Sequence, residues 1–173
     1  AAVRVCAVAI LPPMGRGHVP GRGPYADVLE RAKKYILRTQ QDSGLFRSKR
    51  IPGAGPMYSH GLTTLCMAEM YGMDPDPDLE QAVRKAVDLI VRCQSKAGGW
   101  RYQPNPSQQD VSVTVMQVVA LRAANNAEVR SEEHTSELQL LVNLVCRLLL
   151  QTKNRTRREY IIHNLRSQRL KSI

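Results

Sequence analysis

The residues best suited to metal or thiol chemistry are widely separated in this sequence. Its four cysteines, Cys6, Cys66, Cys93 and Cys146, form no CxxC pair and have no neighbouring histidine at metal-ligand spacing. His60 precedes Cys66 by six positions, which takes the two side chains off a shared helical face, and it has no acidic partner within a turn. The sequence therefore predicts no metal site, buried thiols on helices, and a histidine that starts a helix or packs in a core.

Carboxylates gather at one place, in the segment Asp74-Pro-Asp-Pro-Asp78. Aspartate and proline are typical of helix starts, where a carboxylate caps free backbone N–H groups and favours the positive end of the helix dipole. We expect a turn here, followed by a helix that Asp78 caps. A cation site built from the same carboxylates is the alternative.

A motif of the form Q-x-x-x-G-x-aromatic occurs twice, 54 residues apart. We call the two copies the first clamp (Gln40, Gly44 and Phe46) and the second clamp (Gln94, Gly98 and Trp100). The glutamine can bond to free backbone groups at an adjacent helix end. The glycine allows the positive φ of a tight turn, and the aromatic ring can cover the amide. Each clamp is therefore expected to fix one helical hairpin against the next.

The segments around the clamps agree at the same offset, so the chain divides into two hairpins, at about 24–72 and 73–126. In each hairpin the first helix is amphipathic, with charges opposite its apolar positions. These positions are Val28, Ala32, Tyr35 and Ile36 in helix 25–41, and Ala82, Ala86, Leu89, Ile90 and Cys93 in helix 79–93. The second helices, 57–72 and 111–124, are apolar nearly all round and are predicted to be the inner, buried ones.

Two clamps framed by such helices resemble the prenyltransferase and squalene-oxidase repeat superfamily, which includes squalene-hopene cyclases and protein prenyltransferase β-subunits. The stretches GHVPGRGPY, GPMYSHGLTTL and GGWRYQP look closest to bacterial members of unassigned activity. The resemblance covers about residues 1–129 and implies an all-α fold, the α/α toroid, in which an inner ring of helices surrounds a cavity. Because a full ring takes about six hairpins, we expect a fragment, with 1–13 ending a preceding repeat and the remaining repeats missing.

In this superfamily the chemistry lies at the N-terminal ends of the inner helices, at the cavity mouth. Hopene-type cyclases carry D-x-D-D-T-A there, and the middle acid protonates an alkene. The comparable segment here begins at Asp110 and keeps Thr114, but has Ser112 and Val113 in place of the acid and its neighbour. Because neither side chain can donate that proton, no catalytic residue is expected, and Asp110 is predicted to be a helix N-cap.

The D-x-C zinc pair of prenyltransferases is absent, as is the CGEQ motif of the thioester domains that share the toroid. Neither a metal nor a cofactor is therefore expected. The polar residues that remain as candidates for lining the cavity mouth are Tyr58, His60, Asp110 and Thr114. The partner that the resemblance implies for such a cavity is a hydrophobic or isoprenoid small molecule.

The stretch 130–173 differs in composition from what precedes it, since all 11 glycines and all 10 prolines lie before residue 130. RSEEHTSELQ at 130–139 resembles the in-frame translation of a common sequencing adapter, and NLVCRLLL at 143–150 resembles its continuation. We expect 130–173 to be a non-native tail. The alternative is an amphipathic helix with a basic end that binds RNA or a membrane.

The formal net charge of +10 is consistent with a polyanion partner, but half of the excess lies in that tail. Because we expect that tail to be non-native, we expect no nucleic-acid partner. No run of about 18 apolar residues occurs, so we also expect no transmembrane segment. The predicted function is a non-catalytic scaffold, structural or binding a hydrophobic ligand. The alternative is an isoprenoid cyclase whose catalytic repeat lies outside the chain.

Overall fold

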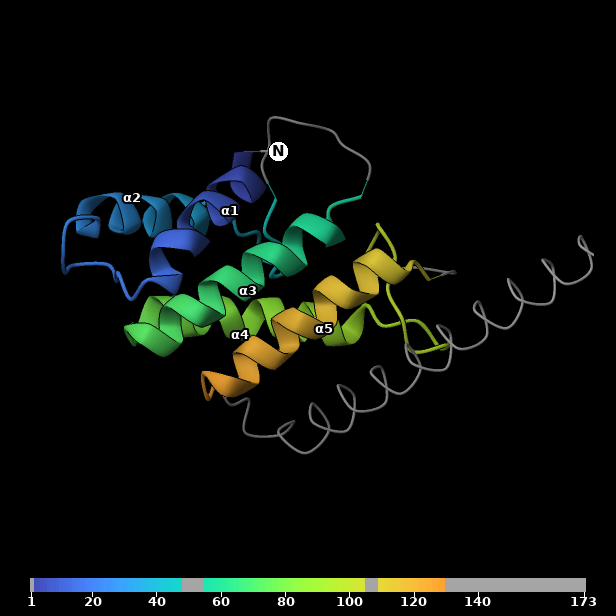
Figure 1. Ribbon diagram of the computed structural model, residues 1–173. Helices are drawn as coiled ribbons and strands as arrows, with labels where there is room; N and C mark the ends of the chain where they lie inside the picture. The colour runs from blue at the N-terminus through green and yellow to red at the C-terminus, as the bar shows by residue number, and fades with distance from the viewer. Residues whose placement is uncertain (1, 48–54, 105–108, 130–173) are drawn as a thin grey trace, which may run out of the picture.

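The computed structural model describes residues 2–47, 55–104 and 109–129. Within these ranges the chain forms helices and no strand, so the all-α prediction is confirmed (Figure 1). The five helices are α1 (Ala2–Gly15), α2 (Ala26–Leu37), α3 (Met57–Met73), α4 (Pro77–Arg92) and α5 (Val111–Asn126). The predicted tail 130–173, Cys146 included, lies outside the described residues.

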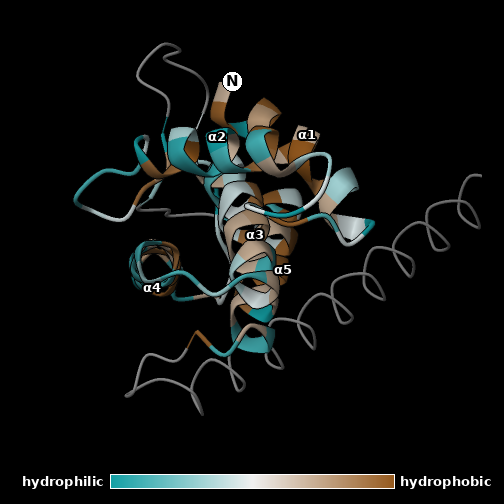
Figure 2. Cartoon of the chain, turned by 90° about the vertical axis from the view of Figure 1, so that its left-hand side faces the viewer, coloured by the Kyte–Doolittle hydropathy of each residue, from teal (hydrophilic) through white to brown (hydrophobic). Residues whose placement is uncertain are grey.

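The helices alternate in direction along the chain (Figure 1). α1, α3 and α5 run the same way, from the upper right to the lower left of the view, whereas α2 and α4 run back. α3 has its most extensive contact with α5 and also packs against α1 and α4. In the view of Figure 2, α4 lies to one side of the α3–α5 pair, and α1 and α2 lie together above it. The three parallel helices thus form a row with α3 in the middle.

The helix that follows the aspartate-rich segment begins earlier than its sequence suggests. The N-cap of α4 is Asp76, not Asp78: its carboxylate accepts hydrogen bonds from the N–H groups of Asp78 and Leu79, at 2.9 and 3.3 Å. Pro77 then occupies the first helical position, where its missing N–H costs nothing. The prediction of a capped helix was right, but the capping residue is two positions earlier.

The predicted buried face of α2 was partly wrong. Ala32 and Ile36 are buried as expected, but Val28 and Tyr35 are exposed. The buried positions follow the helical pattern i, i+3, i+4, i+7, and the third of them is a lysine: Leu29, Ala32, Lys33 and Ile36. α2 is also shorter than predicted, since it ends at Leu37 rather than residue 41. In α4 and its C-cap Cys93, by contrast, all five predicted apolar positions are buried.

The two apolar helices differ in how completely they are covered. α3 is buried along most of its length, as predicted for an inner helix. α5 is buried on the side that includes Val113, Gln117 and Leu121, but Val111, Val115 and Val119 are exposed. The prediction that α5 is a buried helix is therefore met on one side only. Among the helices described, none is long and apolar enough to cross a membrane.

Candidate functional site

The first clamp joins the turn after α2 to the side of α4. Gln40 Nε2 donates to the carbonyl oxygen of Gly44 at 3.1 Å and to that of Ala82, inside α4, at 2.8 Å. The expected bond from the glutamine to a neighbouring helix is therefore present. Its acceptor differs from the prediction, because Ala82 lies well inside α4 and its carbonyl is not a free group of a helix end.

Gly44 is required at the first clamp for two reasons. Its φ is +92°, a conformation that costs residues with a Cβ atom free energy. In addition, a Cβ placed on Gly44 would overlap the backbone carbonyl oxygen of Lys85 in α4. The absence of a side chain at this position therefore lets the turn lie directly against α4.

The second clamp has the same local geometry. Gln94 Nε2 donates to the carbonyl oxygen of Gly98 at 2.8 Å, and Gly98 has a φ of +88°. Phe46 of the first clamp and Trp100 of the second are both fully buried. The internal hydrogen bond and the positive φ recur 54 positions apart.

His60, a candidate for the cavity mouth, is fully buried and bonded to the first clamp. Its Nδ1 lies 3.2 Å from the backbone nitrogen of Phe46, and its Nε2 lies 3.2 Å from the carbonyl oxygen of Ala86. Because an amide N–H can only donate, Nδ1 must accept, so the proton is on Nε2 and the ring is neutral. Burial lowers the pKa of His60 to about 4, while the Ala86 carbonyl opposes that shift. His60 is thus a packing histidine that anchors the aromatic residue of the clamp.

Thr114 has the equivalent role at the second clamp. The backbone N–H of Trp100 donates to Oγ1 of Thr114 at 3.0 Å, just as that of Phe46 donates to His60. Both acceptors follow their aromatic residue by 14 positions, and both belong to a helix of the parallel row. The backbone N–H of the aromatic residue therefore has a buried acceptor in both clamps, the imidazole of His60 in the first and the hydroxyl of Thr114 in the second.

Near the C-terminal end of the helix before each clamp, one backbone carbonyl accepts a side-chain hydrogen bond, and the donor differs between the two clamps. Trp100 Nε1 donates to the carbonyl oxygen of Ile90 at 2.7 Å. The equivalent carbonyl 54 residues earlier is that of Ile36, which accepts from Oγ1 of Thr39 at 2.7 Å. Phe46 has no N–H on its ring, so a threonine supplies the bond that the indole makes later. This donor exchange is not apparent from the motif alone.

Asp110 is the N-cap of α5, as predicted. Its Oδ1 accepts from the N–H groups of Ser112 and Val113, at 2.9 and 3.1 Å, and from the Ser112 hydroxyl at 2.5 Å. The Ser112 hydroxyl, followed by the Val113 amide, lowers the pKa of the Asp110 carboxyl. A carboxyl held in its ionised form in this way is suited to capping a helix and not to donating a proton.

The structure does not bring the four candidate cavity residues together through hydrogen bonds. The bonds of His60 and Thr114 go to backbone groups, and those of Asp110 go to Ser112, Val113 and the Tyr102 hydroxyl. Tyr58 is half-buried and packs against the core. Three of the four polar groups are therefore engaged in holding the fold.

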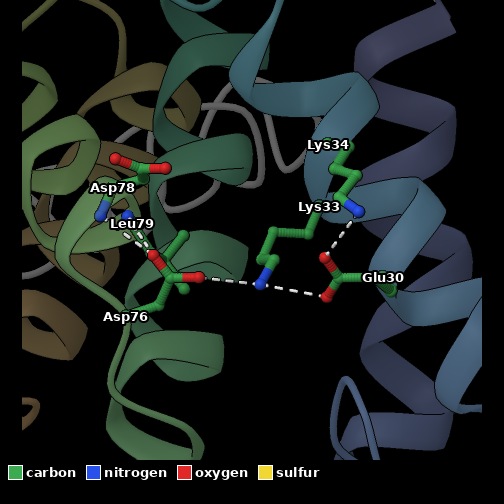
Figure 3. Close-up of polar contacts among 6 residues, drawn as sticks. All are labelled: Glu30, Lys33, Lys34, Asp76, Asp78 and Leu79. Atoms are coloured by element: carbon green, nitrogen blue, oxygen red, sulfur yellow. Dashed lines mark hydrogen bonds and ion pairs between the residues drawn. The ribbon is translucent and has the colours of Figure 1, made fainter.

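Sequence reasoning missed a partly buried ion-pair network between α2 and the N-cap of α4 (Figure 3). Lys33 Nζ lies 2.8 Å from Oδ2 of Asp76 and 3.0 Å from Oε2 of Glu30, and Lys34 Nζ lies 3.2 Å from Oε1 of Glu30. Burial lowers the pKa of Lys33, but its bonds to Asp76 and Glu30 outweigh that effect and leave it raised. Lys33 in turn lowers the pKa of both carboxyls. The available signal was the helical phase, which places Lys33 beside Leu29 and Ile36.

Thiols and carboxylates do not gather elsewhere in the described ranges. No group of three or more His, Cys, Asp or Glu side chains there is placed to hold a metal ion. Burial raises the pKa of the Cys66 thiol to about 12, so this sulfur is protonated at neutral pH. Comparisons of the chain with family models, with curated proteins and with solved structures give no match.

Proposed function

We propose that residues 1–129 are part of an α/α toroid of the prenyltransferase and squalene-oxidase repeat kind, and that this part is a scaffold without chemistry of its own. It is either purely structural or binds a hydrophobic, isoprenoid-like small molecule. In this proposal α1, α3 and α5 are successive inner helices, and α2 and α4 are outer helices. The remaining repeats lie outside the chain.

The observation that carries the proposal is the equivalence of the two clamps. The amide of Phe46 bonds to His60, and the amide of Trp100 bonds to Thr114, with both partners shifted by 54 residues. The shared direction of α1, α3 and α5 is a second support (Figure 1). A hairpin that is repeated with its stabilising contacts is what a repeat protein requires.

The scaffold role rests on the residues at the start of α5, where hopene-type cyclases have their proton donor. An acid that protonates an alkene must be kept protonated, which requires a raised pKa. Ser112 stands at the position of that acid, and Asp110, the one acid left in the segment, has a lowered pKa and caps α5. Ser112 and Val113, at the positions of the cyclase acids, take part in the same cap. The alternative, a cyclase whose catalytic repeat lies outside the chain, would need acids from elsewhere in the ring.

Incubation of the full chain with squalene in detergent micelles, followed by mass spectrometry, separates the scaffold from an enzyme. We expect no cyclised product, and saturable binding of a fluorescent farnesol analogue would support the ligand-binding form of the scaffold. Asp110→Asn is the matched control, because asparagine also caps helices well. A cyclised product that the wild-type chain makes and D110N does not make would refute the scaffold role.

Sequencing genomic DNA across codon 130 tests the toroid itself. We expect further Q-x-x-x-G-x-aromatic motifs, flanked by hairpins like the two seen here, in place of the adapter-like stretch. A D-x-D-D motif, or D-x-C with a later histidine, would favour the catalytic alternative. An uninterrupted frame that continues as RSEEHTSELQ would refute the adapter interpretation and would favour a native basic tail.

A further inference from the structure

An exposed side of α5 carries three valines one turn apart, which we call the α5 face: Val111, Val115 and Val119. They are 59%, 37% and 37% exposed. The residues 54 positions earlier, on α3, are Met57 and Gly61, which are buried, and Leu65, which is half-buried. A second shift of the same length leads to Val3, Ala7 and Leu11 on α1, which are likewise buried or half-buried. The α5 face is therefore the uncovered member of a series of three.

Contacts between α3 and α5 show what covers this face one step earlier. Gln117 Nε2 of α5 donates to the carbonyl oxygen of Met57 at 2.9 Å. A Cβ placed on Gly61 would lie 2.8 Å from the same nitrogen, so the amide of Gln117 lies directly over the glycine. The positions of α3 that correspond to the α5 face are thus covered by a parallel helix, and Gln117 lies over Gly61.

The opposite end of the row carries the complementary surface. The α1 face consists of Val5, Ala9 and Pro12, all exposed, with Val5 at 61%. The equivalent residues of α5, at twice the 54-residue offset, are Val113, Gln117 and Ala120, which are buried against the rest of the fold. The α1 face therefore has the positions with which α5 contacts α3, but no described helix for them to contact.

We propose that a second copy of this chain covers the α5 face with its α1 face, which repeats the α3–α5 contact between molecules. In this arrangement Val115 takes the position of Gly61, and Ala9 of the second copy takes the position of Gln117. The pair Gly61 and Gln117 is thus replaced by Val115 and Ala9. The larger residue has changed sides, and the two pairs fill a similar volume. All six residues of the two faces are apolar, so their burial drives the association.

The contact is head-to-tail, since each copy contributes a different face. Such heterologous contacts close into rings or continue as open chains, and they do not stop at a symmetric dimer. The inference rests on the burial of equivalent residues and needs no ligand, so it would stand even if the isoprenoid proposal failed.

Sedimentation velocity of the full chain over a hundredfold concentration range tests the proposal. We expect the average mass of the wild-type chain to rise beyond that of a dimer. Val115→Asp with Val119→Asp blocks the α5 face, and Val5→Asp with Ala9→Asp blocks the α1 face, so each double variant alone should be a monomer. A one-to-one mixture of the two should give a dimer that grows no further, because one intact face of each kind remains available.

Val28→Asp is the matched control, because Val28 is an exposed valine of α2 outside both faces. This variant should associate like the wild-type chain, and circular dichroism should show equal helix content in all variants. A wild-type chain that stays monomeric throughout would overturn the proposal. Dimers formed by the α1-face variant alone would overturn it as well, since they would mean that two α5 faces pair with each other.

Discussion

Lys33 Nζ lies 2.8 Å from Oδ2 of Asp76, so that a buried lysine of α2 holds the residue that caps α4. The same ammonium group also bonds to Glu30 on its own helix. Replacing Lys33 by methionine keeps the apolar stem but leaves both carboxylates without their cation. We expect Lys33→Met to reduce the free energy of unfolding by about 2 kcal/mol at pH 7, the scale of a hydrogen bond between charged groups.

The loss caused by Lys33→Met should depend on pH. Lys33 lowers the pKa of Asp76 and of Glu30 in the folded state. The stabilisation from these groups is therefore present above their unfolded pKa values, about 4, and disappears as the pH falls through the folded values. Urea denaturation at pH 7 and pH 3 should show the difference between wild type and variant shrinking at pH 3. Lys34→Met is the control: its ammonium group is exposed, and its loss should cost less than about 0.5 kcal/mol.

His60 should make stability fall as the medium becomes acidic. Its folded pKa, about 4, lies below its ordinary value of 6.5, so the unfolded chain binds the proton first. Stability is then complete above pH 6.5 and declines towards pH 4, by up to about 3 kcal/mol. In His60→Asn the amide oxygen can still accept from Phe46 but does not titrate. We expect H60N to be less stable at pH 7.5 and to lose less stability than the wild type between pH 6.5 and 4.

Chemical denaturation at four pH values across this range measures both slopes. The difference between wild type and H60N isolates His60 from the other titrating groups, because these are common to both chains. Equal slopes in the two proteins would mean that His60 is accessible to protons in the folded state.

The features that could be predicted from sequence are those in which local pattern and tertiary packing agree. α4 has a strong helical period, and Ala82, Ala86, Leu89, Ile90 and Cys93 are all buried. Asp110 precedes an apolar segment in a loop-to-helix transition, and it caps α5 as expected. In both cases a single helical period or a single cap explains the residues.

Prediction failed where one local pattern was compatible with two arrangements. Val28 and Tyr35 of α2 have helical spacing, but so do Leu29 and Lys33. Only tertiary contacts, the packing of α2 on α1 and the reach of Lys33 to Asp76, select the second set. Asp76 and Asp78 are both suitable N-caps by residue type. Asp76 is the one that caps α4, and it also forms the ion pair with Lys33. The exposure of Val115 and Val119 depends on which element packs against α5. The apolar residue types of α5 do not identify that element. These choices are tertiary, and the helical period carries no information about them.

Gly44 offers a test of how tightly the first clamp lies against α4. Gly44→Ala should combine the strain of a φ of +92° with overlap of the Lys85 carbonyl, and we expect a loss of about 3 kcal/mol or more in stability. Gly17→Ala is a close control, because Gly17 has a φ of +83° and nothing within 4 Å of an added Cβ. It should cost only about 1 kcal/mol. Thermal unfolding of both variants gives the comparison, and equal losses would mean that α4 moves to accommodate the methyl group.

The donor exchange between the two clamps leads to a rescue experiment. Trp100→Phe removes the indole N–H from the Ile90 carbonyl and gives the second clamp the aromatic residue of the first. We expect it to cost about 1–3 kcal/mol, since the smaller ring also leaves space in the core. The first clamp satisfies the equivalent Ile36 carbonyl with Thr39, and the residue 54 positions after Thr39 is Cys93. Adding Cys93→Thr to W100F should therefore restore part of the lost stability.

Cys93→Thr in the wild-type background provides the fourth corner of a double-mutant cycle. There the indole already donates to the Ile90 carbonyl, so the new hydroxyl adds less than it does in W100F and, at a buried position, should be neutral or destabilising. A favourable coupling of about 1 kcal/mol between the two substitutions is the expected result of urea denaturation. Additive effects would show that Thr39 and Trp100 do not substitute for each other, and that the loss in W100F comes from ring volume alone.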